Sequence, residues 1–384
     1  MGRMLKVLAA GAAGVVCLAG CAGTIALPTS SASAVPSADS PAADVRARMA
    51  LLTGEHAYVV AKLTVAAAAG RKDEFGSYAN LLAANSVELK SVLSKATGET
   101  AAEKFAQAWT QGNGFFVDYV VAVTTHQQDQ ADAAMTNLNT TYVPQMAQDL
   151  SSPLNISTSS ANRMLSEQVT TFKQFVDDVA AGTPPAFYAD LRAAYAKSIA
   201  MGGSIAEATV WKFPDKYPGD ATARGSKARA QLDALLQEHA YLLSMATNAA
   251  ASGATADAAA ATTSLQASAQ DLSHAITSIF GSRAGTQAAQ IWSDEDTSFI
   301  AYASAGDDAT KSAALNALNQ TSTPALTGFL NGLHVTADVA SVTHQTIGVI
   351  DDQRAKSYGI LAAEDRQSAA LLISIGDLMM GVPG

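Results

Sequence analysis

Apolar side chains recur every three or four residues along most of the chain, which is the spacing of one face of an α-helix. Two stretches show the same steps of four, three and four residues: Leu52, His56, Val59 and Leu63, and later Leu235, His239, Leu242 and Ala246. Period-2 runs rich in β-branched residues do not occur, so no strand is predicted. The pattern therefore predicts an all-α protein.

Glycine and proline divide this pattern into helices, because glycine favours the position after a helix and proline favours turns and first helical turns. The predicted helices cover residues 42–69, 73–96, 99–126, 128–150, 158–181 and 185–211, and then, approximately, 226–252, 255–279, 284–305, 307–332, 335–353 and 355–380. Pro153 is expected to lie between two of them. Short connections between successive helices predict antiparallel neighbours.

The second set of helices repeats the first at a nearly constant offset. The phrase Glu55-His56-Ala57-Tyr58 recurs 183 residues later as Glu238-His239-Ala240-Tyr241. The same offset pairs Gly98 with Gly281, Trp109 with Trp292 and Tyr119 with Tyr302, and it then drifts, to 180 at Leu138 and Leu318 and further at Gly202 and Gly376. These matches predict two tandem antiparallel helical bundles related by internal duplication, over residues 45–212 and 226–384, with a linker over 213–225.

The first twenty residues have the layout of a bacterial signal peptide. Arg3 and Lys6 precede an apolar stretch that is too short to span a bilayer. The following Leu18-Ala19-Gly20-Cys21 resembles a lipobox, the motif in which a cysteine receives acyl chains such as palmitate and becomes the first mature residue. Residues 21–44, rich in Ser, Ala and Pro, are then a lipidated cysteine and a flexible tether. We expect a lipid-anchored protein on the extracytoplasmic face of the cell membrane.

Composition narrows the function classes. The chain has 384 residues, of which 48% are hydrophobic and 15% charged, and its net charge of −10 disfavours a nucleic-acid partner. Cleavage of the signal peptide removes Cys17 and lipidation modifies Cys21, so no free thiol is expected in the mature protein. No nucleophile elbow, P-loop or dinucleotide-binding glycine motif occurs. The sequence is therefore interpreted as non-enzymatic.

The repeated Glu-His pairs are the candidate site residues. Glu55 with His56, and Glu238 with His239, occupy equivalent positions, and a carboxylate and an imidazole are common metal ligands. Adjacent helical residues diverge, however, and neither Glu-x-x-His nor His-x-x-x-His occurs. A site could still assemble across helices, for example from His56 and Glu88. In the alternative interpretation, both histidines are hydrogen-bonded core residues.

The repeated phrases resemble an exported bacterial family of helical repeat proteins whose function is not established. The resemblance rests on Glu55-His56-Ala57 with its copy, on Trp109 followed by Phe115-Phe116-Val117-Asp118-Tyr119, and on Phe213-Pro214-Asp215-Lys216-Tyr217. Gly112 and Glu295 stand where the family has a histidine, and Lys197-Ser198 and Leu371-Leu372 replace a later His-Met pair. If the family's histidines bind a metal, the resemblance implies a scaffold or binding role here.

Three functions remain open. The first is a non-enzymatic cell-envelope lipoprotein with a binding or structural role towards an unknown partner, which includes a protein at the envelope. The second is a lipoprotein that binds copper, zinc or iron through His56, His239 and nearby carboxylates, although the sequence names no cofactor. The third is the binding of a small hydrophobic ligand between helices, where pockets are common.

Overall fold

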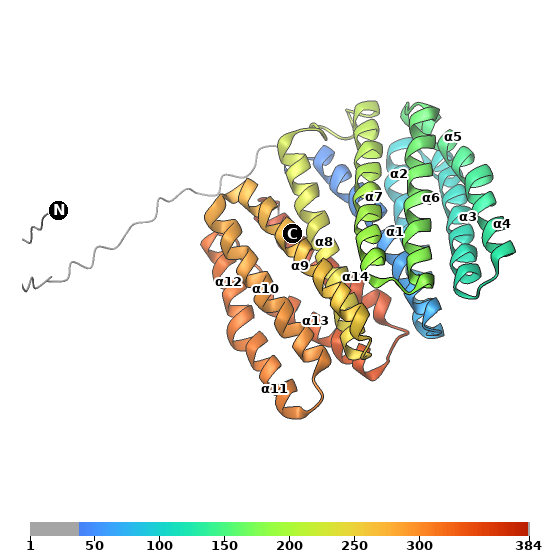
Figure 1. The fold of residues 1–384 in the computed structure, drawn as a ribbon. Helices are drawn as coiled ribbons and strands as arrows, with labels where there is room; N and C mark the ends of the chain where they lie inside the picture. Colours follow the sequence, from blue (N-terminus) through green and yellow to red (C-terminus); the bar gives the residue numbers. More distant parts are fainter. Residues whose placement is uncertain (1–37, 383–384) are drawn as a thin grey trace, which may run out of the picture. The chain divides into compact units, whose positions relative to one another are not determined.

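Helices make up most of the described part of the chain, as the apolar spacing predicts (Figure 1). The computed structural model describes residues 38–382, and within this range no strand occurs. The first half contains α1 (Pro41–Ala68), α2 (Lys72–Thr97), α3 (Glu99–Thr124), α4 (Gln128–Asn137), α5 (Val143–Leu154), α6 (Thr158–Ala181) and α7 (Pro184–Lys212). The second half contains α8 (Arg224–Ala251), α9 (Thr255–Phe280), α10 (Ser282–Ser304), α11 (Asp308–Ala317), α12 (Thr323–Gly332), α13 (Val339–Ala355) and α14 (Leu361–Met379). The all-α fold class is therefore confirmed.

Some predicted boundaries are wrong. The helix expected over residues 128–150 is interrupted by a π-helical segment, Leu138–Tyr142, and then continues to Leu154, with Pro153 inside its last turn. A second π-helical segment, Leu318–Ser322, interrupts the helix expected over 307–332. The two segments lie at equivalent positions, 180 residues apart. Each segment changes the helical register, so that α5 and α12 continue their helices with a rotated face.

The helix expected from residue 355 begins only at Leu361. Lys356 ends α13 with a left-handed backbone, φ 60°, and the residues after it form turns. At the start of the described chain, α1 begins at Pro41, one residue before the expected helix and three residues before the expected end of the tether. Ser40 caps this helix, since its hydroxyl accepts a bond from the Ala43 amide at 3.2 Å. A proline in the first turn costs no hydrogen bond there.

The two halves pack against each other through their first helices. α1 contacts α2, α7 and α8, whereas α8 contacts α9, α14 and α1. The outer contacts are reciprocal, because α7 of the first half touches α9 and α14 of the second half touches α2. Buried apolar side chains from both halves form one continuous core. This repetition of helix order and contacts agrees with the sequence repeat, while the common origin of the two halves stays a prediction.

Single glycines make the sharpest connections in both halves. Gly98 joins α2 to α3 with φ 86°, and Gly281 joins α9 to α10 with φ 92°. A side chain would be strained at either position, because this left-handed region favours residues without a Cβ. The glycine pair predicted from the repeat is thus a pair of equivalent turns.

The described chain starts beside the linker between the halves. The carbonyl of Ala38 accepts a bond from Arg229 at 3.1 Å, and the amide of Ala42 donates to the carbonyl of Pro218 at 3.3 Å. The predicted signal peptide, Cys21 and the tether up to residue 37 lie outside the described residues. Within residues 38–382, no helix has both the length and the apolar character needed to cross a bilayer.

Candidate functional site

The carboxylate of Glu55, on α1, is buried and fully engaged. Arg366, on α14, donates to both of its oxygens, at 2.8 Å from Nε and 2.5 Å from a terminal nitrogen. Asn85 donates to Oε2 at 2.8 Å, and Tyr241 donates to Oε1 at 3.0 Å. Glu55 is only 4% exposed, so these bonds replace the water that its charge loses on folding. Two of the three partners belong to the other half of the chain.

Glu238, on α8, has the equivalent partner from the first half. Arg192, on α7, donates to its two oxygens at 3.1 and 3.2 Å. Each arginine also reaches a second acid: Arg192 contacts Asp271 at 2.7 Å, and Arg366 contacts Glu88 at 2.6 Å. Burial raises the pKa of Glu238, although Arg192 opposes the shift. The pairs Glu55–Arg366 and Glu238–Arg192 are therefore two reciprocal salt bridges between the halves.

His56 is a core residue with both ring nitrogens occupied. Its Nε2 lies 2.8 Å from Oδ1 of Asn113, and its Nδ1 lies 3.2 Å from the amide nitrogen of Gln168. These partners assign the ring proton to Nε2, because Gln168 donates to Nδ1. The ring also contacts Trp109, with centroids 4.8 Å apart. Burial, opposed by the bond to Asn113, lowers the pKa of His56 to about 4, so it is neutral at neutral pH.

His239 is equally buried but has different partners. Its Nε2 lies 3.1 Å from Oδ1 of Asp296, and its Nδ1 has no hydrogen-bond partner among the described residues. Burial lowers its pKa, but the charges of Asp296, Glu295 and Glu238 outweigh burial, and the net shift is upward. Equivalent positions in the two halves thus hold one neutral histidine and one that favours its proton.

The predicted metal ligands are not brought together as one cluster. Within residues 38–382, no group of three or more His, Cys, Asp or Glu side chains has an arrangement that could hold a metal ion. Glu88, considered as a partner for His56, instead contacts Arg366 and, at 3.4 Å, Arg48. Each carboxylate of the repeated Glu-His pairs is used in a bridge between the halves.

A long hollow lies along the outer face of α8. It consists of two adjoining cavities of about 1080 and 560 Å³, which share Lys227, Gln231, Leu235 and Asp271 as lining residues. We call the two together the α8 groove. α9 lines the larger cavity, and α1, α7 and α9 contribute to the smaller one. Glu238 lines the smaller cavity, whereas Glu55, His56 and His239 are not among the lining residues.

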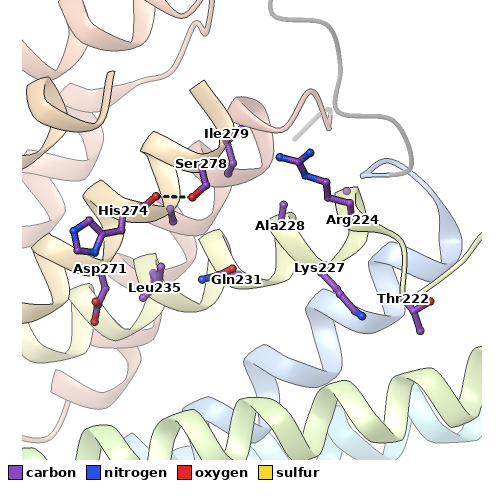
Figure 2. A pocket seen from close by; sticks show the side chains of 12 residues that line it. Thr222, Arg224, Lys227, Ala228, Gln231, Leu235, Asp271, His274, Ser278 and Ile279 are labelled. Carbon is purple, nitrogen blue, oxygen red and sulfur yellow. Dashed lines mark hydrogen bonds between the residues drawn. The ribbon is translucent and has the colours of Figure 1, made fainter. Parts of the chain in front are cut away.

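The groove has an apolar floor and a cationic end. Figure 2 shows the larger cavity, with Leu235 on α8 and His274 and Ile279 on α9. Arg224 and Lys227, from the first turn of α8, line the end that lies next to the linker. Both are exposed, and neither makes a salt bridge with any described residue. These two cations are therefore available to an anionic group, beside apolar surface that can receive an aliphatic chain.

Sequence reasoning missed this groove, because a sequence does not show how the successive helices α7, α8 and α9 pack together with α1, which is distant along the chain. The two arginines that bridge the halves can, in contrast, be recognised from the sequence repeat. Arg192 and Arg366 are related by the same late offset, 174, as Gly202 and Gly376, and Glu88 and Asp271 are related by 183.

Comparison of the chain with protein-family models, curated proteins and solved structures finds no match. The resemblance to the exported helical family stays a prediction.

Proposed function

We propose that the protein is a non-enzymatic, lipid-anchored protein of the cell envelope whose helical body binds a small amphiphile in the α8 groove. The observation that carries this proposal is the groove itself. It combines a volume large enough for a small ligand with an apolar floor and two exposed cations that have no salt-bridge partner among the described residues. An anionic head group beside Arg224 and Lys227, with its chain along Leu235, satisfies both features.

The position of the groove supports a role near a membrane. Arg224 and Thr222 lie at the end where the described chain begins, since Ala42 bonds to the linker at Pro218. A tether that leads from Cys21 to Ser37 would hold this end towards the bilayer. Two acyl chains on the cysteine would suffice for stable attachment.

Titration with dodecanoate tests the proposed binding. We expect one saturable site per chain, weakened at least tenfold in Leu235→Glu and in the double variant Arg224→Glu, Lys227→Glu. Val87→Glu is the matched control, because Val87 is 68% exposed on α2 and lies outside the groove. The absence of saturable binding, or equal weakening in all three variants, would contradict the proposal.

The anchor is tested separately. Cys21→Ala should release the protein from the membrane fraction and abolish incorporation of labelled palmitate. Retention of this variant in the membrane would exclude lipidation at Cys21 without affecting the proposed groove.

A further inference from the structure

Trp211, in the last turn of α7, differs from the other two tryptophans of the chain because it is exposed. Trp109 and Trp292 are buried, whereas Trp211 is 73% exposed. An indole ring combines a large apolar surface with one N–H donor, and such rings gather where one side is apolar and the other is wet. The ring of Trp211 is therefore free to enter a surface of that kind.

Aromatic and cationic side chains follow Trp211 in the linker. Phe213 and Tyr217 are half-buried, and the amides of Lys216 and Tyr217 both donate to the carbonyl of Phe213 at 3.1 Å, which closes a turn. The ammonium group of Lys216 lies over the ring of Phe213, 5.4 Å from its centroid. Lys212 is exposed. Aromatic rings mixed with lysines are typical of protein segments at the boundary between water and lipid.

The linker covers one end of the helices (Figure 1). Lys216 donates to the carbonyls of Lys95 and Ala96, at the end of α2, each at 3.2 Å. Lys212 donates to Asn155, at the end of α5, also at 3.2 Å. We call this surface the linker end and define it by Lys95, Trp211, Lys212, Phe213, Lys216 and Tyr217.

The charge around the linker end is opposite in sign to that of the whole protein. The chain has a net charge of −10, but residues 211–227 contain four Lys or Arg and two Asp. Lys95, Lys212 and Lys216 are exposed and make no salt bridge with any described residue. A local excess of cations attracts an anionic surface, and it disfavours contact with the same end of a second copy.

The segment that precedes the described residues reaches the body at this end. The amide of Ala42 donates to the carbonyl of Pro218 at 3.3 Å, so the described chain starts beside the linker. Between Cys21 and Ala38 an extended chain spans at most about 55 Å, at ~3.3 Å per residue. A membrane that holds Cys21 is therefore within reach of the linker end.

We propose that the linker end docks on the surface of a bilayer that contains anionic lipid. The ring of Trp211 inserts among the head groups, and Lys95, Lys212 and Lys216 lie near the lipid phosphates. This inference rests on the lipid anchor proposed above, which supplies proximity, but not on the ligand of the α8 groove. Docking in this way places Arg224, at the cationic end of that groove, next to the head groups.

Quenching of Trp211 by brominated lipid tests the docking. Residues 21–384 are coupled through Cys21, their one cysteine, to a maleimide lipid in vesicles of phosphatidylcholine and phosphatidylglycerol. Attachment then does not depend on lipidation in a cell, so failure of the docking is distinguished from failure of the anchor. The emission of Trp211 is the difference between this protein and Trp211→Phe, and we expect bromine on the acyl chains to quench roughly half of it or more.

A displaced indole controls for the orientation of the body. Val87 is 68% exposed and lies on α2, outside the linker end. In the double variant Trp211→Phe, Val87→Trp the introduced indole should stay unquenched, because docking through the linker end keeps this side of α2 away from the acyl chains.

A second pair of variants tests the charges. Lys212→Gln with Lys216→Gln should lower the quenching of Trp211 at least twofold. Lys72→Gln with Lys356→Gln is the matched control, since both are exposed lysines outside the linker end, and it should leave the quenching unchanged.

Four outcomes overturn the inference. Two are an unquenched Trp211 on the coupled vesicles and equal quenching of the indole introduced by Val87→Trp. The third is equal quenching of Trp211 on vesicles of phosphatidylcholine alone, or in the two pairs of lysine variants, which would show that charge is not recognised. The fourth is shielding of Trp211 that grows with protein concentration in the absence of vesicles, which would assign the surface to a second copy.

Discussion

Tyr58 and Tyr241, which occupy equivalent positions of the repeat, stack on each other where α1 meets α8. Their ring centroids are 5.2 Å apart and their planes differ by 10°. A contact between a position and its own copy is what a twofold-related pair of surfaces produces. Around it, Arg366 holds Glu55 and Arg192 holds Glu238. The contact between the halves therefore contains one aromatic stack and two equivalent salt bridges, one on each side of it.

Removal of one bridging arginine should destabilise the protein strongly. Arg366→Met leaves the buried charge of Glu55 without its main partner, and we expect a loss of about 2–4 kcal/mol in the free energy of unfolding, since Arg366 itself is partly exposed. Urea denaturation measures this. The double variant Arg366→Met, Glu55→Gln should recover at least half of the loss, because no buried charge remains. A double variant as unstable as the single one would show that packing, not charge, sets the effect.

His56 should make stability depend on pH below neutrality. Its pKa is about 4 in the folded protein and near 6.5 in an unfolded chain, so the unfolded state binds the proton more tightly. Its contribution is complete above pH 6.5 and is lost as the pH falls towards 4, by up to about 3 kcal/mol. Denaturation at several pH values should show this slope, and His56→Gln should flatten it. An unchanged slope in the variant would assign the effect to other groups.

His239 should titrate in the opposite direction. Its pKa is raised above 6.5, so its charged form favours folding below that pH, and the contribution is lost as the pH rises through the folded value. Nitrogen NMR of the imidazoles should show His239 protonated under conditions in which His56 is neutral. In Asp296→Asn the pKa of His239 should fall. Parallel titration of the two histidines would contradict the assigned environments.

The close approach of α1 and α7 should make Gly202 intolerant of any side chain. A Cβ there would lie 2.5 Å from the carbonyl oxygen of Met49 and 2.8 Å from Cα of Ala50, and both are backbone atoms that cannot move aside. Gly202→Ala should cost about 1–3 kcal/mol. The control Gly114→Ala, inside α3 with no atom within 4 Å of the new Cβ, should stabilise by about 0.5–1 kcal/mol. Thermal unfolding of the two variants measures both shifts.

The sequence predicts the helices well because their signals are local. Gly70, Gly98 and Gly182 lie just after the helices predicted over residues 42–69, 73–96 and 158–181, and each has a positive φ. Pro153 was misplaced because a proline in the last helical turn removes a single bond, which the helix tolerates at its end. The π-helical segments gave no local signal, since Leu138 and Leu318 fit the apolar spacing of an ordinary helix.

The candidate sites were only partly predictable, since they depend on contacts between distant segments. Glu55 and Glu238 were singled out, but their partners lie 311 and 46 residues away, respectively. Trp109 and Phe116, which belong to the repeated phrases, are buried in the core. In contrast, the contact of Asp296 with His239 emerges only from the structure, because the two residues lie on different helices.

The reciprocal bridges give the first half both members of a complementary pair, Glu55 as acceptor and Arg192 as donor. In these contacts the two halves of the described chain are arranged like the subunits of a symmetric dimer that are joined in sequence. In a true homodimer every substitution appears twice, once in each subunit. The covalent connection removes this constraint, so that one half can carry Glu295 and Asp296 while the other has Gly112 and Asn113 at the equivalent positions.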